Sequence, residues 1–266
     1  MTPRIVSTGS GTPLILIPGL HGRWEYMRET IDALARSFRV VTFALAGERA
    51  SGVPFDAALG LDNYVSQVSR ALDEARIERA VICGVSFGGV VAARFAAAHP
   101  DRTAALVLTS APGPIWHLKP KHRLYARAPW IFAQLFVVEA TRRLRAELVV
   151  VFPHRGARVR FGLKQLGAFL QAPISLGRMG QRARVISTLD LADDCRRITV
   201  PTLVVTGEAG LDHVVPVEGS SEYTRLIAGA RRAVIERTGH QGVLTRPDVY
   251  AQLVRDFVET LRDAAA

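Results

Sequence analysis

The sequence is poor in cysteine and has no apolar run long enough to cross a bilayer. Its two cysteines, Cys83 and Cys195, lie far apart. Because Cys83 sits in an apolar segment, we expect buried thiols and no disulfide or metal site. The apolar run at residues 14–17 is far shorter than the ~20 residues that a transmembrane helix needs. Residues 1–11 lack the basic-then-apolar profile of a signal peptide, so we expect a cytoplasmic protein without stable membrane insertion.

Acidic residues are also few relative to basic ones. The chain has 34 Lys and Arg against 24 Asp and Glu, a formal net charge of +10. The excess is almost wholly arginine, scattered without basic-aromatic modules, so nucleic acid is not an expected partner. One local excess lies between His117 and Arg160, where only Glu139 and Glu147 are acidic. Its basic residues are Lys119, Lys121, Arg123, Arg127, Arg142, Arg143, Arg145, Arg155, Arg158 and Arg160. This segment could contact an anionic substrate or, peripherally, a membrane surface, although a solvated face of ordinary helices is the simpler explanation.

The pattern of apolar residues predicts an α/β fold. At 266 residues with a hydrophobic share of 48%, the chain can form one large domain with a sizeable core. Strand-like segments are expected near residues 4–6, 14–17, 39–44, 81–85, 104–109, 200–206 and 233–235, with helical patterns near 25–38, 62–75, 87–99, 217–227 and 247–262. This alternation predicts a mostly parallel central sheet with helices on both faces.

The alternation stops in the middle of the chain. From about residue 111 to residue 188 the pattern is helical and is interrupted by prolines, so we expect an inserted helical cap. The expected organisation is a first part of the core at residues 1–112, the cap at 113–190 and a second part of the core at 191–266.

A candidate nucleophile follows the expected strand that begins at Val81. That strand runs into Gly84-Val85-Ser86-Phe87-Gly88 and then directly into an Ala-rich helix. A serine on such a tight strand-to-helix turn adopts a strained backbone conformation, and the residues two before and two after it must be small. The start of the helix adds partial positive charge beside the hydroxyl. The pattern therefore predicts that Ser86 is a nucleophile.

A serine hydroxyl needs a base and a carboxylate that orients the base. His240 lies between two glycines, after the last expected strand and before the last helix, and it is our candidate base. For the acid we choose Asp212, on the loop after the preceding expected strand. Glu208 is the alternative because it lies closer to the end of that strand.

These residues resemble the α/β-hydrolase superfamily, and its serine esterase and lipase-like members, over essentially the whole chain. The resemblance is carried by Ser86 in Gly-x-Ser-x-Gly, by Asp212 with Pro216 four residues later, and by Gly239-His240 ahead of Arg246-Pro247. The order serine, acid, histidine is the family's order. The spacing from Gly207 to Asp212 is two residues longer than is common, which leaves Glu208 open as the acid.

The resemblance also implies an oxyanion hole. The backbone amide of Phe87 would supply one donor and that of Leu20 the other. Pro18 stands where the family usually has a histidine, and His21 is the candidate to brace the loop instead. The implied chemistry is two-step acyl transfer without metal or organic cofactor.

Substrate contacts are expected from aromatic residues on both sides of the site. Trp24 and Tyr26 follow the predicted oxyanion loop, and Trp116 and Trp130 lie in the cap. They could line an apolar acyl pocket or pack the cap against the core.

We therefore expect a serine hydrolase that cleaves a small-molecule carboxylic ester through an acyl-enzyme. An acyltransferase, a carbon-carbon bond hydrolase or a cofactor-free haloperoxidase would use the same three side chains. A non-catalytic receptor on a hydrolase fold is the alternative from another class. The oligomeric state is not predicted.

Overall fold

The centre of the molecule is a seven-stranded sheet with the strand order β1-β3-β2-β4-β5-β6-β7. The computed structural model describes residues 2–117, 120–128 and 131–263. The strands are β1 (Ile5–Thr8), β2 (Thr12–Ile17), β3 (Phe38–Phe43), β4 (Ala80–Val85), β5 (Thr103–Thr109), β6 (Thr202–Thr206) and β7 (Arg231–Val234). All neighbouring strands are parallel except the edge strand β1, which runs antiparallel to β3. The predicted mostly parallel sheet is confirmed.

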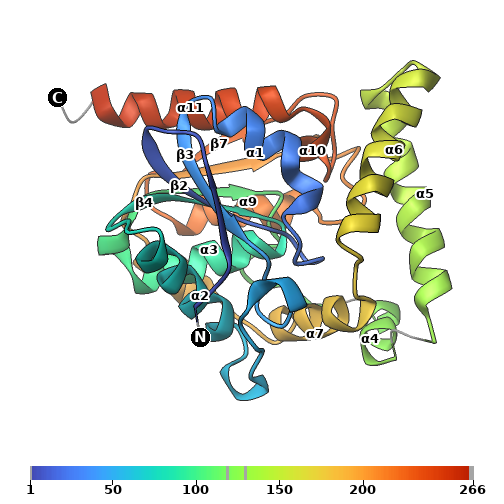
Figure 1. Ribbon diagram of the computed structural model, residues 1–266, viewed down its shortest axis with the longest axis horizontal. Coiled ribbons are helices and arrows are strands. Elements are labelled where there is room, and N and C mark those ends of the chain that lie inside the picture. The colour runs from blue at the N-terminus through green and yellow to red at the C-terminus, as the bar shows by residue number, and fades with distance from the viewer. Residues whose placement is uncertain (1, 118–119, 129–130, 264–266) are drawn as a thin grey trace.

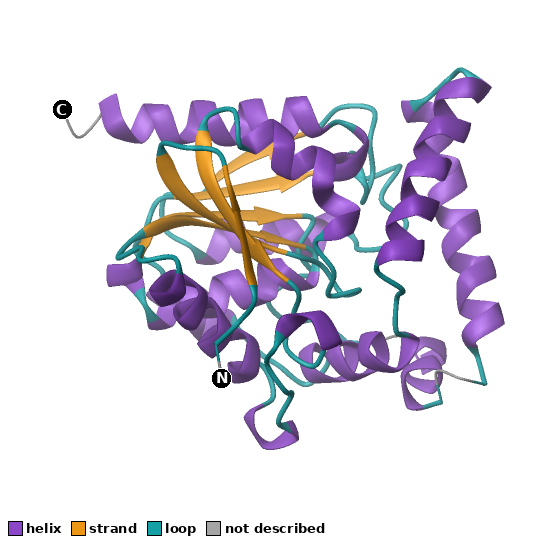
Figure 2. Cartoon of the chain, in the orientation of Figure 1, coloured by secondary structure: helices purple, strands orange, loops and turns teal. Residues whose placement is uncertain are grey.

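Helices cover both faces of this sheet (Figures 1 and 2). The core helices are α1 (Arg28–Leu34), α2 (Asp62–Glu74), α3 (Phe87–Ala98), α8 (Ala192–Arg197), α9 (Val217–Leu226), α10 (Gly242–Thr245) and α11 (Pro247–Asp263). Helices α2 and α3 lie on one face, and α1 and α11 pack together on the other.

Successive residues of the central strands belong alternately to two separate hydrophobic clusters, because side chains alternate between the faces of a sheet. In β2, Ile15 and Ile17 pack with α2 and α3, while Leu14 and Leu16 pack with α1 and α11. The two cysteines are divided in the same way. Cys195 belongs to the first cluster and Cys83 to the second, and both thiols are buried, as predicted.

Between β5 and α8 the described residues form four helices: α4 (Pro120–Arg127), α5 (Ala133–Val151), α6 (Arg155–Gln171) and α7 (Leu176–Ile186). In Figure 1, α5 and α6 form an upright layer beside the carboxyl ends of the strands, and α4 and α7 lie at its base. Ile115 and Asp190 form an antiparallel bridge where the insertion leaves and rejoins the core. We propose residues 113–190 as the cap on this basis.

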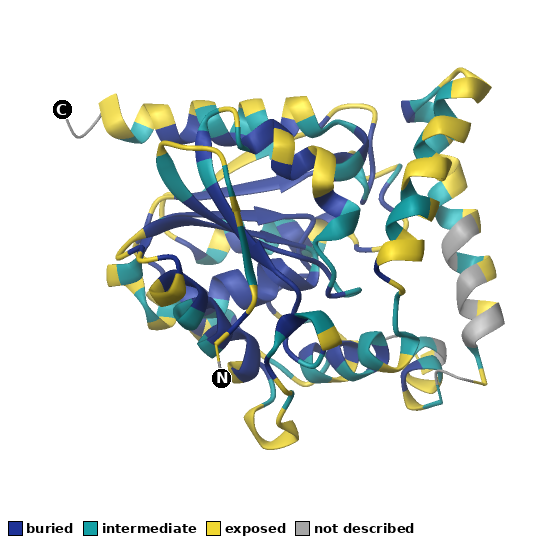
Figure 3. Cartoon of the chain, viewed as in Figure 1, coloured by how far each residue is buried: buried dark blue, intermediate teal, exposed yellow. Residues whose placement is uncertain are grey.

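The cap is less deeply packed than the core. Figure 3 shows the central strands as buried and α6 as a mixture of exposed and intermediate residues. Within the described residues, none of the helices has both the length and the hydropathy needed to cross a bilayer.

Candidate active site

Ser86 occupies the turn between β4 and α3. Its backbone lies at φ 53° and ψ −118°, a region that residues other than glycine rarely adopt. A Cβ atom on Gly84 would lie 2.1 Å from the carbonyl oxygen of Gly88, and one on Gly88 would lie 2.3 Å from that of Ile17. Strand and helix can therefore meet at this angle only with glycine at both positions, as the motif predicts.

The imidazole of His240 bridges the serine and Asp212. Its Nε2 is 3.2 Å from Ser86 Oγ, and its Nδ1 is 3.2 Å from Asp212 Oδ2. The second carboxylate oxygen of Asp212 accepts hydrogen bonds from the backbone amides of Val214 and Val215, at 3.0 and 2.9 Å. Burial acts to raise the pKa of Asp212, but the hydrogen bond and charge of His240, together with these two amides, outweigh it and lower that pKa. The carboxylate thus remains ionised beside the imidazole.

Glu208 lies elsewhere. Its side chain is exposed, and Oε1 accepts a hydrogen bond of 2.6 Å from the backbone amide of Arg237. The amides of Leu211 and Asp212 both donate to the Glu208 carbonyl, at 3.0 and 3.1 Å. This turn takes up the two additional residues of the loop, so the extra length does not carry Asp212 away from His240.

Two glycines bring the acid and base loops together. A Cβ on Gly207 would lie 2.4 Å from the carbonyl oxygen of Gly239, and one on Gly239 would lie 2.2 Å from that of Leu211. The close approach sets the distance between Asp212 and His240.

The predicted oxyanion loop runs past the serine. A Cβ on Gly19 would lie 3.4 Å from Ser86 Cβ, and Leu20 and Phe87 line the same cavity as Ser86. His21 follows, and its Nδ1 accepts a hydrogen bond of 3.2 Å from the Arg23 amide. Burial, reinforced by the charges of Arg182 and Arg23, lowers the pKa of His21 to about 4. His21 is therefore a neutral imidazole at neutral pH.

Two buried charged residues reach these loops from the cap, and the sequence pattern predicted a role for neither. Arg182 of α7 donates to the Leu20 carbonyl at 3.0 Å and pairs with Glu48 at 2.7 Å. Glu147 of α5 accepts hydrogen bonds from the backbone amide of Gln241. No local pattern marks such contacts, because they depend on how α5 and α7 dock onto the core.

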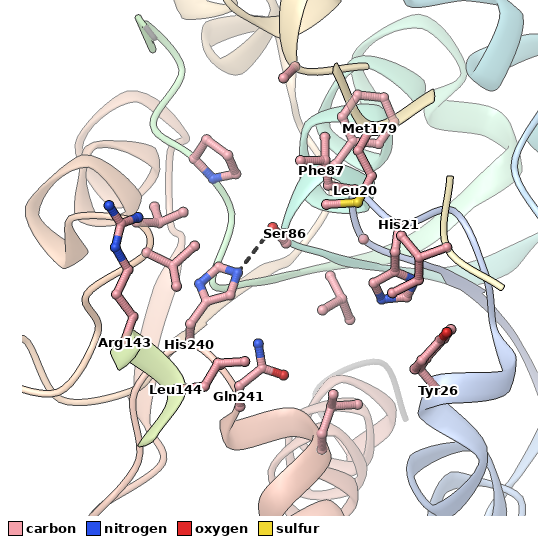
Figure 4. Close-up of a pocket in the computed structure, with 18 of the residues that line it drawn as sticks. Leu20, His21, Tyr26, Ser86, Phe87, Arg143, Leu144, Met179, His240 and Gln241 are labelled. Atoms are coloured by element: carbon pink, nitrogen blue, oxygen red, sulfur yellow. Dashed lines mark hydrogen bonds between the residues drawn. The ribbon is translucent and has the colours of Figure 1, made fainter. Parts of the chain in front are cut away.

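A cavity of about 470 Å³ opens at Ser86. Its apolar lining includes Val85, Phe132, Leu144, Leu148, Phe161, Ile174, Met179, Ile186, Val214 and Leu244. In Figure 4, His21 and Tyr26 lie on one side of Ser86 and His240, and Arg143 and Leu144 lie on the other. The site can thus hold an apolar group beside a hydrogen-bonded serine. Within the described residues, no cluster of three or more metal-ligating side chains was found.

The four aromatic residues predicted to contact substrate differ in their positions relative to the cavity. Tyr26 and Trp116 line the cavity, and Trp116 also packs against the core. Trp24 stays a prediction: the described cavity lining does not include it, and it packs against the core cluster beside α1 and α11, with the Arg28 guanidinium over its ring at 5.4 Å. Trp24 stands directly before the short helical turn Glu25–Met27, which contains Tyr26. Trp130 lies outside the described residues.

Comparisons with known proteins bear on the family and the fold. A family model described as "alpha/beta hydrolase fold" matches residues 12–247. A 2-hydroxymuconate semialdehyde hydrolase from Pseudomonas sp. (strain CF600) is 30% identical over 277 residues, covering 97% of this chain and 90% of the relative. An enol-lactonase from Burkholderia xenovorans LB400 superposes with a TM-score of 0.77 at 22% identity, covering 97% of this chain and 96% of the other. An esterase from Exiguobacterium antarcticum gives a TM-score of 0.77 at 20% identity, with coverages of 97% and 95%. At these identities the two solved structures support the fold alone.

Proposed function

This chain belongs to the α/β-hydrolase family, and on that premise we propose that it is a serine hydrolase that cleaves carboxylic esters of apolar acyl groups. The observation that carries the proposal is the imidazole of His240 within 3.2 Å of both Ser86 Oγ and Asp212 Oδ2. A base in hydrogen-bond reach of a hydroxyl and oriented by a carboxylate is the arrangement that activates a serine. We also infer a cytoplasmic location, because both cysteines are buried free thiols.

In the proposed reaction Ser86 Oγ attacks the ester carbonyl while His240 Nε2 takes its proton. The backbone amides of Leu20 and Phe87 donate to the oxyanion of the tetrahedral intermediate. His240 then protonates the departing alcohol, leaving an acyl group on Ser86. A water molecule, deprotonated by His240, attacks this acyl-enzyme and releases the acid and the serine hydroxyl. Asp212 remains a carboxylate throughout and stabilises the imidazolium in both steps.

The cavity lining supports an apolar acyl group as the part of the substrate that is bound. The wall around Ser86 is formed mainly by aliphatic and aromatic side chains. Tyr26 is held by a hydrogen bond of 2.9 Å from its hydroxyl to the Ala172 carbonyl, which fixes its ring in the wall. Burying an acyl chain here gains about 0.8 kcal/mol for each methylene group.

Carbon-carbon bond hydrolysis is the second candidate, favoured by the relative at 30% identity whose name specifies a 2-hydroxymuconate semialdehyde. That substrate carries a carboxylate, and a carboxylate in an apolar cavity requires a cation. Within the described lining, Arg143 is the only lysine or arginine. Its Nη2 lies 3.3 Å from Glu139 and 3.4 Å from His122, so Glu139 already neutralises part of its charge. This competition favours the ester as substrate.

One substrate panel tests both candidates. It contains p-nitrophenyl esters of increasing acyl length, with and without an acceptor alcohol, and 2-hydroxymuconate semialdehyde. For the esters we expect kcat/KM to rise about fourfold per methylene until the cavity is filled. We expect Ser86→Ala to abolish hydrolysis, whereas Ser187→Ala, which removes an exposed hydroxyl bonded to the Arg184 carbonyl, leaves it unchanged.

Other outcomes of this panel would redirect the assignment. Preferred turnover of the semialdehyde, lost in Arg143→Gln, would establish the second candidate. Transfer to the alcohol in preference to water would indicate an acyltransferase. Equal, negligible turnover in the wild type and Ser86→Ala, with retained ligand binding, would support a receptor and contradict our proposal.

A further inference from the structure

Glu147 is a buried carboxylate that reaches from the cap to the loop of His240. It lies near the end of α5, and 2% of its surface is exposed. The backbone amide of Gln241 donates to both of its oxygens, at 3.0 Å to Oε1 and 3.2 Å to Oε2. Gln241 is the residue after His240, so a side chain of the cap holds the peptide group next to the proposed base.

The charge balance around Glu147 shows what this carboxylate interacts with. Burial raises its pKa, and the negative charge of Asp212 acts in the same direction. The backbone amides of Gly239 and Gln241 and the charge of His240 oppose the rise without cancelling it, so the pKa of Glu147 stays above its ordinary value. Within the described residues no lysine or arginine forms an ion pair with Glu147. Its stabilising partners are thus the two amides that flank His240 and the imidazole itself.

Neighbouring cationic groups are engaged elsewhere. Arg143, one turn earlier on α5, donates to Glu139 at 3.3 Å. Arg237, on the loop before His240, donates to the Val150 carbonyl at 3.4 Å. The second contact again joins α5 to the loop of His240, so this end of α5 and that loop form one packed unit.

We propose that Glu147 is a positioning residue for His240: the cap, and not the core alone, holds the catalytic base in place. The carboxylate holds the peptide group between His240 and Gln241 through the Gln241 amide, and in its ionised form it attracts the imidazolium that forms when Ser86 loses its proton. A buried, hydrogen-bonded carboxylate is costly to maintain unless its partners are held in place. The inference rests on the proposed function, because it assigns a role relative to that base.

The same helix also forms part of the cavity wall. Leu144 and Leu148 of α5 line the cavity, whereas Glu147, between them in sequence, is absent from the described lining. A substrate that packs against these leucines contacts the helix that holds His240. Cap position and base orientation are therefore linked through α5.

The test compares Glu147→Gln and Glu147→Asp with wild type, using one p-nitrophenyl ester across the pH range. A glutamine keeps one acceptor oxygen and replaces the other by an NH₂ group beside the same Gln241 amide, so we expect kcat to fall by about a hundredfold, as for a small misplacement of a catalytic group. KM should change much less, because Glu147 does not line the cavity. The acidic limb of the kcat/KM profile should move to lower pH, because the imidazolium loses a neighbouring negative charge. Glu147→Asp keeps that charge, so its acidic limb should stay near the wild-type position.

A matched control separates this effect from general loosening of the cap. Glu29 of α1 pairs with Lys164 of α6, an ion pair about half exposed that joins cap and core away from both catalytic loops. We expect Glu29→Gln to retain wild-type kcat and the same acidic limb. Thermal unfolding of each variant verifies that the proteins compared are folded.

Two results would overturn the proposal. One is a Glu147→Gln protein with wild-type kcat and an unmoved acidic limb. The other is an equal loss of kcat in Glu147→Gln and Glu147→Asp with unmoved limbs, which would indicate a purely structural role. If Ser86→Ala hydrolysed the ester as well as wild type, the proposed function would fail instead. Loss of activity in Ser86→Ala alone would leave the hydrolase assignment intact and remove only the role of Glu147.

Discussion

The two carboxylate oxygens of Asp212 have different partners. One faces His240, and the other accepts hydrogen bonds from two backbone amides. An asparagine would present an NH₂ group to one of these partners and would favour the wrong imidazole tautomer. We expect Asp212→Asn to lower kcat for ester hydrolysis by about 10⁴-fold, the loss seen for the same change in other serine triads. Glu208→Gln is the matched control, since the described contacts of the Glu208 side chain are limited to the Arg237 amide. A larger loss in the control than in Asp212→Asn would reassign the acid to Glu208.

Residues in local motifs were the ones that the sequence could predict. Ser86 and His240 stand in glycine-flanked turns after strands, and both the strand and the glycines leave a pattern in the sequence. Arg182 and Glu147 leave none, because their partners are backbone groups more than 90 residues away. Trp24 shows a related limit: it is two residues from Tyr26 in the chain, but it packs against the core cluster and is absent from the described cavity lining.

At the scale of elements, the junction of β4 and α3 is the most constrained part of the molecule. A Cβ on Gly88 would lie 2.3 Å from a backbone oxygen of β2, whereas one on Gly162 of α6 would meet nothing within 4 Å. We expect Gly88→Ala to destabilise the fold by several kcal/mol, because the overlap is with backbone that cannot move independently. Gly162→Ala should stabilise it by about 0.5–1 kcal/mol, as alanine does in a helix interior. Urea unfolding of both variants provides the measurement, and a well-folded Gly88→Ala protein would contradict the tight strand-to-helix packing.

Apolar runs and prolines predicted most element positions. Buried parallel strands read as continuous apolar segments, and the expected strand at residues 104–109 differs by one residue from β5. Pro120 and Pro247 begin α4 and α11, and Pro153 separates α5 from α6, as expected from a residue that ends or begins helices. The expected helix at 25–38 was too long. A helical turn precedes α1, which ends at Leu34, and β3 begins at Phe38.

For the whole molecule, cap and core are joined at the loops that carry the chemistry. Arg182 binds the oxyanion loop and Glu147 binds the base loop, and both side chains are buried. Arg182 is also half of a buried ion pair with Glu48, and truncating one partner of such a pair costs about 3–5 kcal/mol, so this contact holds α7 firmly where it meets the site. The outer side of the cap has no comparable packing, since no residue of α6 is buried.

The net charge of +10 and the outer face of α6 both bear on the expected peripheral contact with a membrane. Val159, Leu163, Leu166 and Leu170 recur at helical spacing, and each is more than half exposed. Exposed Arg155 and Arg160 lie on the same helix. An apolar stripe beside basic side chains favours an anionic lipid surface, so we expect the protein to sediment with phosphatidylglycerol vesicles and not with phosphatidylcholine vesicles.

Replacing the two arginines separates this contact from an ordinary solvated face. Arg155→Gln combined with Arg160→Gln should weaken binding to anionic vesicles by roughly thirtyfold, because each basic residue near the surface contributes about 1 kcal/mol. Hydrolysis of a soluble ester should be unaffected, because neither residue lines the cavity. Equal sedimentation of the wild type and the double variant would show that these arginines do not hold the protein at the lipid surface. If the wild type sedimented with neither lipid, the basic cap would be an ordinary solvent-exposed surface.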